Sequence, residues 1–261
     1  MAYTVAVSGK GGTGKTTIAA LIIDTLASLR CGSILAVDAD PATNLHLALG
    51  LPLGQTVGQV REEALSMVRS GSFPQGLSKQ DFFEYELQDL LVEGDDVDLL
   101  AMGRPEGPGC YCSANNMLRA ILDRLARSYD YVVIDTEAGM EHLSRHTTRD
   151  VDYLLLVSDP TVRGVRAAAI MARMVPELQI KVGRIGFALN RVPAASWRSL
   201  YPHVLEAIER EGLQLVAAFP NDPLVGEYDA VGKPIRLLPS DSPLRQAVAD
   251  LTRQEILPHR G

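Results

Sequence analysis

The chain alternates short apolar, β-branched runs with longer stretches of helical periodicity. We predict strands at residues 3–8, 33–38, 96–102, 129–136, 152–158, 183–190 and 213–219. Helices are predicted at residues 16–30, 114–128, 161–175 and 197–211. The strand runs are too apolar for half-exposed strands and too short for buried helices. Their alternation with helices therefore predicts βαβ units and a mostly parallel, twisted sheet with helices on both faces.

No linker, internal repeat or low-complexity tract interrupts this pattern. We therefore predict a single α/β domain over residues 1–261. Residues at about 55–95 are polar and only weakly periodic, and they predict a helical insertion between two strands.

A glycine-rich loop links the first predicted strand to the first predicted helix. Its sequence, GKGGTGKTT at residues 9–17, fits the phosphate-binding pattern G-x-x-x-x-G-K-[ST] in the correct strand–loop–helix context. The residues expected to contact the nucleotide are Gly9, Lys10, Gly11, Gly12, Thr13, Gly14, Lys15, Thr16 and Thr17. Backbone N–H groups would surround the phosphates, Lys15 would reach the β- and γ-phosphates, and Thr16 would ligate Mg²⁺. The fold expected is that of a single-domain P-loop NTPase.

The amino-acid composition and net charge argue against two classes of binding partner, nucleic acids and anionic membranes. The net charge is −7, with 46% hydrophobic and 22% charged residues and no basic patch. This balance argues against binding nucleic acid through its phosphates and against docking on an anionic membrane. The N-terminus lacks the pattern of a secretory leader, and no apolar run approaches the length of a membrane span. The three cysteines are an odd number, which does not suit a framework of paired disulfides. We therefore expect a cytoplasmic protein in a reducing compartment.

Lys10 adds a second lysine to the phosphate loop. With it the loop resembles the Min/Par/nitrogenase-iron-protein class of deviant Walker A ATPases. The resemblance implies an ATP-driven homodimer in which Lys10 reaches the nucleotide of the partner chain. It also implies that Asp40, in VDADP, activates the attacking water and that Asp38 supports Mg²⁺ or its waters. An alternative for Asp40 is an Asx turn, which Asp-Pro commonly makes.

A second carboxylate motif ends the strand predicted at 129–136. Asp135 with Gly139 four residues later resembles the Walker B and switch II pattern of the same class. The resemblance implies that Asp135 holds Mg²⁺ through a water and that the Gly139 N–H contacts the γ-phosphate. Ligands at the carboxyl ends of parallel strands agree with this placement.

The expected nucleotide is ATP, because no N-K-x-D motif follows a late strand. Asn190 ends such a strand and is followed by Arg191. By resemblance to the class, Asn190 meets the adenine, and the backbone of Pro220, Asn221 and Asp222 lies along the base.

Cys110 and Cys112 form a C-x-C pair after a glycine-rich loop. Thiolates suit Zn²⁺, Cu⁺ or thiophilic Ni²⁺, and a two-fold dimer would supply four of them. A redox pair or an incidental pair are alternatives, although a disulfide across one residue is strained. Cys31 is expected to pack in the core, and His142 with His146 could share a metal at i, i+4 spacing.

Together, GKGGTGKTT, VDADP, C-x-C, DTEAGMEHLSR and LLPSDSPLR resemble the nickel-insertion ATPases of carbon monoxide dehydrogenase and acetyl-CoA synthase maturation. This resemblance implies a dimer that binds Ni²⁺, with Zn²⁺ competing, at Cys110 and Cys112 of both chains. ATP binding and hydrolysis would deliver the metal to the apo-dehydrogenase or apo-synthase. Two alternatives remain open: a Min/Par-type partition switch, and an iron–sulfur reductase resembling the nitrogenase iron protein.

Overall fold

The computed structural model describes residues 2–74, 76, 78, 82, 90–103, 125, 127–137, 150–177, 181–193 and 197–259. The strands are β1 (Tyr3–Gly9), β2 (Ile34–Ala39), β3 (Asp98–Ala101), β4 (Tyr131–Thr136), β5 (Asp150–Ser158), β6 (Lys181–Val192) and β7 (Leu215–Pro220). The α-helices are α1 (Lys15–Ser28), α2 (Leu45–Leu49), α3 (Val57–Ser70), α6 (Val162–Glu177), α7 (Trp197–Leu200), α8 (Pro202–Glu211), α9 (Pro223–Val231) and α10 (Pro243–Leu251). Short 3₁₀ segments η2 (Ile235–Leu237) and η4 (Leu257–His259) and a π-helical turn η3 (Thr252–Ile256) complete the C-terminal part.

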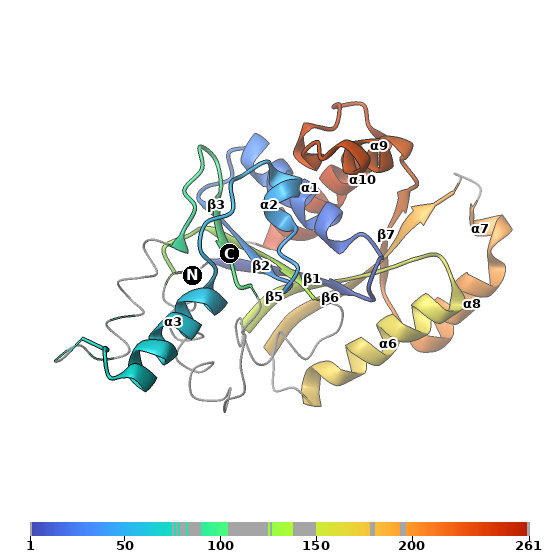
Figure 1. Ribbon diagram of the computed structural model, residues 1–261. Coiled ribbons are helices and arrows are strands. Elements are labelled where there is room, and N and C mark those ends of the chain that lie inside the picture. The colour runs from blue at the N-terminus through green and yellow to red at the C-terminus, as the bar shows by residue number, and fades with distance from the viewer. Residues whose placement is uncertain are drawn as a thin grey trace.

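The seven strands form one sheet in the order β3-β2-β4-β1-β5-β6-β7 (Figure 1). Every neighbouring pair of these strands is parallel. From the central β1 the chain passes to β2 on one side, and after β4 it crosses to β5 on the other. Such a reversal opens a crevice at the carboxyl ends of the central strands, where α/β sheets bind ligands. The loop that follows β1 begins at this crevice.

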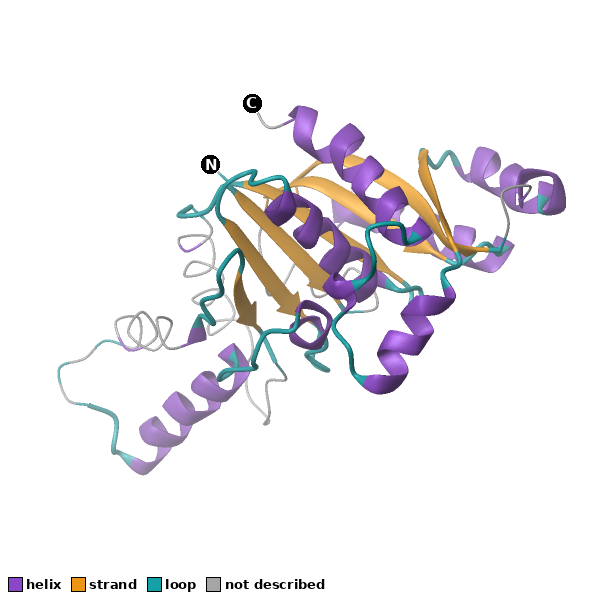
Figure 2. Ribbon diagram, turned by 90° about the horizontal axis from the view of Figure 1, so that it is seen from above, coloured by secondary structure: helices purple, strands orange, loops and turns teal. Residues whose placement is uncertain are grey.

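Helices cover both faces of the sheet (Figures 1 and 2). The alternation of side chains along β1 shows the two layers, because Val5 and Val7 pack with α1, α2 and α10, whereas Ala6 packs with α3, α6 and α8. β1 is buried along its whole length, as expected for the centre of a parallel sheet. The predicted fold class is confirmed. No helix in the described part of the chain is long and apolar enough to cross a bilayer.

The predicted helix over 197–211 is wrong as one element. α7 ends at Leu200, Tyr201 has non-helical dihedral angles (φ −126°, ψ 54°), and Pro202 opens α8. Proline has no N–H to continue the helical ladder but fits the first turn of a new helix. α9 and α10 are helices that the apolar pattern did not predict. Each begins with a proline directly after a capping residue, Asp222 for α9 and Ser242 for α10.

α3 lies within the region predicted as a helical insertion. It begins at a capping box, in which Thr56 Oγ1 accepts the Gln59 N–H at 3.3 Å and the Thr56 N–H donates to Gln59 Oε1 at 2.8 Å. Val57, Val60 and Ala64 then pack its buried side against the sheet. The helix predicted at 114–128 falls almost wholly outside the described residues.

Candidate functional site

The phosphate loop runs from the end of β1 into the first turn of α1, and two of its glycines are required by close neighbours. A Cβ at Gly9 would overlap the carbonyl oxygen of Val157 on β5, and a Cβ at Gly14 would overlap the side-chain amide of Asn190. Gly14 also caps α1 with a left-handed backbone, at φ 87°. The loop is therefore held tightly against β5 and β6, with the N-terminus of α1 at its far side.

The two lysines of the loop have different environments. Lys15 is only 7% exposed, and its Nζ donates to the Lys10 carbonyl at 3.4 Å. The same carbonyl accepts from Thr13 Oγ1 at 2.9 Å. The Lys10 side chain is exposed, and none of the described residues forms an ion pair with it. Lys15 therefore places its charge inside the loop, whereas Lys10 presents its charge outward.

Asp38 and Asp135 lie side by side at the carboxyl ends of β2 and β4, where they are register partners. Thr16 Oγ1 donates to Asp135 Oδ2 at 2.6 Å, which joins the first turn of α1 to β4. Burial raises the pKa of Asp135 to about 7, against the lowering effects of Thr16 and Lys15. Burial likewise raises the pKa of Asp38 to about 6, although two backbone N–H groups oppose it. Two adjacent carboxylates with raised pKa values favour a cation between them and the phosphates.

The residues fit Mg²⁺. Its preferred ligands are oxygen atoms, which Thr16 and Asp135 supply. Asp135 Oδ1 is buried and has no hydrogen-bond partner among the described residues, so it has capacity left for a metal ligand or its water. Thr16 and Asp135 would thus hold Mg²⁺, and bound Mg²⁺ supplies charge neutralisation to the phosphates.

The loop after β2 is organised by Asp38. Its Oδ2 accepts the Leu45 N–H at 2.8 Å and its Oδ1 accepts the Asp40 N–H at 3.1 Å. Asp40 Oδ1 accepts the Ala42 N–H at 2.8 Å, so the Asx contact expected for Asp-Pro is present. Thr43 has a left-handed backbone at φ 47°, an outlier for a β-branched residue. Asp38 therefore acts first on its own loop, and a role for it beside Mg²⁺ stays a prediction.

A pocket of about 250 Å³ adjoins the phosphate loop. Its walls are Gly14, Thr17, Asn190, Arg191, Pro220, Asn221, Asp222, Pro223, Val225, Gly226, Asp229 and Leu244. The structure thus brings all four predicted base-contacting residues next to the loop. It also brings residues that the sequence pattern missed, among them Arg191, Asp229 and Leu244.

Asn190 connects the wall of this pocket to the phosphate loop. Its Nδ2 donates to the Thr13 carbonyl at 2.8 Å, and its Oδ1 accepts the Arg191 N–H at 2.9 Å. Arg191 adopts a left-handed backbone, at φ 57°. Asn190 is 4% exposed, and these two hydrogen bonds give both its amide nitrogen and its amide oxygen a partner inside the protein.

Asp222 lines the pocket but does not offer its carboxylate to it. Oδ1 accepts the Leu224 N–H at 3.1 Å as the cap of α9, and Oδ2 accepts Ser242 Oγ at 2.6 Å. Asp222 is 7% exposed, and these two contacts tie the start of α9 to the cap of α10.

Several predicted residues lie outside the described part of the chain: Gly139, Cys110, Cys112, His142 and His146. Cys31 is half-buried and packs against the core, as predicted for a packing residue. Within the residues that the structure describes, no group of three or more His, Cys, Asp or Glu side chains could hold a metal ion.

Comparison with known proteins agrees with this geometry. The model of the CobQ/CobB/MinD/ParA nucleotide binding domain matches residues 4–235, and the chain belongs to this family. An uncharacterised ATP-binding protein of Methanocaldococcus jannaschii is 42% identical over 97% of this chain and 98% of its own. The carbon monoxide dehydrogenase accessory protein CooC of Rhodospirillum rubrum is 33% identical over 68% of this chain and 70% of its own.

The fold is shared with solved members of the family. The septum site-determining protein MinD of Pyrococcus horikoshii, solved with Mg-ADP, superposes with a TM-score of 0.69. The match covers 100% of this chain and 99% of that chain at 21% identity. At this identity the likeness establishes the P-loop fold and leaves the biological role open.

Proposed function

We propose that this protein is an ATP-hydrolysing switch that works as a homodimer. The observation that carries the proposal is that the phosphate loop contacts two features at once: Thr16 in its last turn bonds Asp135, and Thr13 in its middle bonds Asn190, which lines the adjoining pocket. A nucleotide bound there would place its phosphates in the loop and its base in the pocket. The absence of an N-K-x-D motif after a late strand supports adenine over guanine.

Hydrolysis requires a group that orients the attacking water. Asp40 lies two residues beyond Asp38 at the same edge of the sheet and is partly exposed. Only its Oδ1 accepts a hydrogen bond from the described residues, so its other oxygen is open to a water. We assign it that role, with Lys15 stabilising the charge that develops on the transferred phosphoryl group.

Dimerisation is the proposed role of Lys10. Its side chain is exposed and forms no ion pair with a described residue, so its ammonium is available to the phosphates of a second chain. Two nucleotides would then lie between two facing protomers, and binding of one ligand would affect the association of the chains.

The test measures MgATP affinity, phosphate release and dimerisation on matched variants. Asp40→Asn should retain ATP binding and reduce kcat by at least about 100-fold. Lys10→Ala should bind ATP as a monomer and hydrolyse it slowly, whereas Lys15→Ala should lose tight binding. Asp250→Asn, an exposed substitution on α10, should behave as wild type. Absence of ATP binding by the wild type would refute the proposal.

A second, finer proposal is that the switch delivers nickel to carbon monoxide dehydrogenase or acetyl-CoA synthase. Two observations support it: the similarity to CooC, whose name gives it a role with carbon monoxide dehydrogenase, and the C-x-C pair. Cys110 and Cys112 of two chains would supply four thiolates for Ni²⁺, with Zn²⁺ as a competitor.

Anaerobic size-exclusion chromatography with metal analysis tests the finer proposal. One nickel ion per two chains, lost in Cys110→Ala/Cys112→Ala and kept in Cys31→Ala, is the expected result. Nucleotide-dependent dimers without bound metal would favour a Min/Par-type partition switch instead. A brown dimer containing iron and sulfide would favour a reductase.

A further inference from the structure

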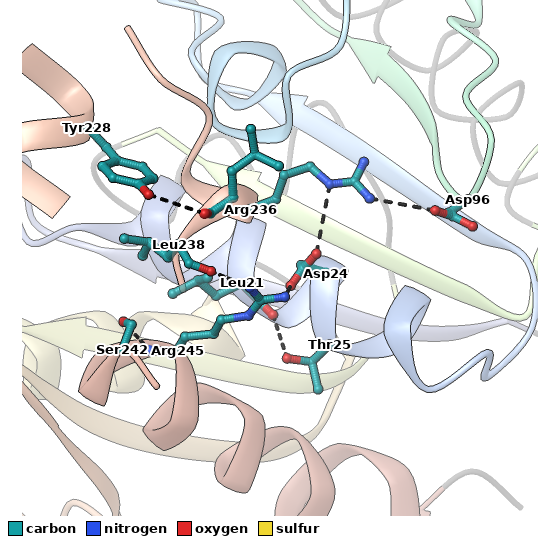
Figure 3. Close-up of polar contacts among 10 residues, drawn as sticks. Leu21, Asp24, Thr25, Asp96, Tyr228, Arg236, Leu238, Ser242 and Arg245 are labelled. Carbon is teal, nitrogen blue, oxygen red and sulfur yellow. Dashed lines mark hydrogen bonds and ion pairs between the residues drawn. The ribbon is translucent and has the colours of Figure 1, made fainter. Parts of the chain in front are cut away.

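In the C-terminal half of α1, a partly buried ion pair joins α1 to α10 (Figure 3). Arg245 Nη2 donates to Asp24 Oδ2 at 2.7 Å, and Arg245 Nη1 donates to the Leu238 carbonyl. The Asp24 side chain is 8% exposed. One planar guanidinium is thus bound by two elements at once, which a flexible ammonium would do less well.

A second arginine lies near Asp24 without the same geometry. Arg236 Nε is 3.8 Å from Asp24 Oδ1, and its Nη2 is 3.6 Å from Asp96 Oδ2. Both distances exceed those of a good charged hydrogen bond. Arg245 is therefore the group that holds Asp24, and Arg236 provides a natural control because it shares the charge and the neighbour.

The residues next to Arg245 belong to the base pocket. Leu244 forms part of its wall. Ser242, which caps α10, accepts the Arg245 N–H at 3.2 Å and donates to Asp222 Oδ2 at 2.6 Å. Asp222 in turn caps α9, which lines the pocket. The first turn of α10 therefore shapes the pocket directly through Leu244 and indirectly through Asp222.

On α1, the ion pair is connected to the phosphate side along the helix itself. Asp24 follows Thr17 by seven residues, which places the two on the same face of the helix about two turns apart. Thr17 lines the base pocket at its phosphate end. α1 and α10 also lie side by side over the sheet (Figure 2). The Asp24–Arg245 pair thus adds a polar link to the apolar packing that holds α10 against the helix that begins at the phosphate loop.

We propose that Arg245 is a positioning residue for nucleoside recognition, acting through Asp24 on one side and through Ser242 and Asp222 on the other. It holds the base pocket at the correct separation from the phosphate loop. The inference rests on the proposed ATP-binding function and adds a determinant of affinity that does not itself touch the nucleotide. It predicts that loss of the pair weakens recognition of the nucleoside and spares recognition of the phosphates.

Two ligands separate these effects. MgATP uses the loop and the base pocket, whereas magnesium tripolyphosphate uses the loop alone. Calorimetric titration of both ligands into wild type, Arg245→Lys, Ser242→Ala and Arg236→Gln provides the comparison. For Arg245→Lys and Ser242→Ala we expect MgATP affinity to fall by roughly tenfold and tripolyphosphate affinity to stay within about twofold. Arg236→Gln should match wild type for both ligands.

A purely structural role for Arg245 would give a different result. Affinities for both ligands would fall together, or the melting temperature would fall with MgATP affinity unchanged, and either result overturns the inference. If Arg245→Lys folds poorly, Asp24→Asn takes its place, because it removes the charge of the same pair with almost no change in side-chain shape. Failure of the wild type to bind either ligand would instead refute the proposed function itself.

Discussion

Asn190 is where the base pocket and the phosphate loop meet, and Asn190→Asp tests that junction with almost no change in shape. The substitution keeps Oδ1, which accepts the Arg191 N–H at 2.9 Å. It replaces the Nδ2 donor, which binds the Thr13 carbonyl at 2.8 Å, with a second acceptor. When ionised, the new carboxylate would face the Thr13 carbonyl with no proton between them.

The expected loss follows from the burial of the site. Asn190 is 4% exposed, so the Thr13 carbonyl would be left without its partner in a place that water reaches poorly. Such a loss costs about 1–3 kcal/mol, equivalent to roughly 5- to 150-fold in affinity if the loop must reorder to bind phosphate. A protonated carboxyl can donate its O–H to Thr13 and restore the contact. Burial should raise the pKa of the new group, as it raises that of Asp135 to about 7.

The defect in Asn190→Asp should therefore depend on pH. We expect MgATP affinity, measured by calorimetry relative to wild type, to be nearly normal at about pH 5.5 and clearly reduced at about pH 8.5. Asn190→Ala cannot be rescued by a proton, so its deficit should be the same at both values. Equal deficits for Asn190→Asp at both pH values, or no deficit at the higher one, would refute the reasoning.

Three further predictions concern the same crevice. Gly9→Ala should lower the free energy of unfolding by about 1–3 kcal/mol in thermal melts, because its Cβ would overlap the Val157 carbonyl. At Gly12 an added Cβ meets no atom within 4 Å, so Gly12→Ala should cost only about 1–2 kcal/mol, for its left-handed backbone. Thr16→Val should abolish the enhancement of nucleotide affinity by Mg²⁺, and Thr16→Ser should retain it; equal behaviour of the two would exclude the hydroxyl as a ligand. Without metal, the pKa of Asp135 is about 7 in the folded chain and about 4 in the unfolded chain. The folded chain therefore binds more protons between about pH 4 and pH 7, and the free energy of unfolding should fall as the pH rises through this range. Urea titrations should show a shallower fall for Asp135→Asn, and an unchanged slope would contradict the raised pKa.

Local patterns along the chain were sufficient to predict the phosphate loop and the sheet. β1, the glycine loop and α1 are contiguous, so the motif and its structural context appear together in the sequence. The buried strands are apolar on both faces because helices cover both, which makes them visible as short runs. The break at Pro202 and the helices that begin at Pro223 and Pro243 were signalled by capping residues and prolines, but the apolar pattern alone did not indicate them.

Contacts between distant segments could be decided only by the tertiary structure. Thr13 and Asn190 meet because β1 and β6 lie on either side of β5, and nothing local to either residue indicates this hydrogen bond. The carboxylate of Asp222 could have pointed into the pocket, but it accepts a hydrogen bond from Ser242, the cap of another helix. Composition and spacing determine which groups are available, because they act over a few residues. Folding determines which of those groups satisfy one another and which remain for a ligand, because a buried polar group is bonded to whatever the packing brings within reach.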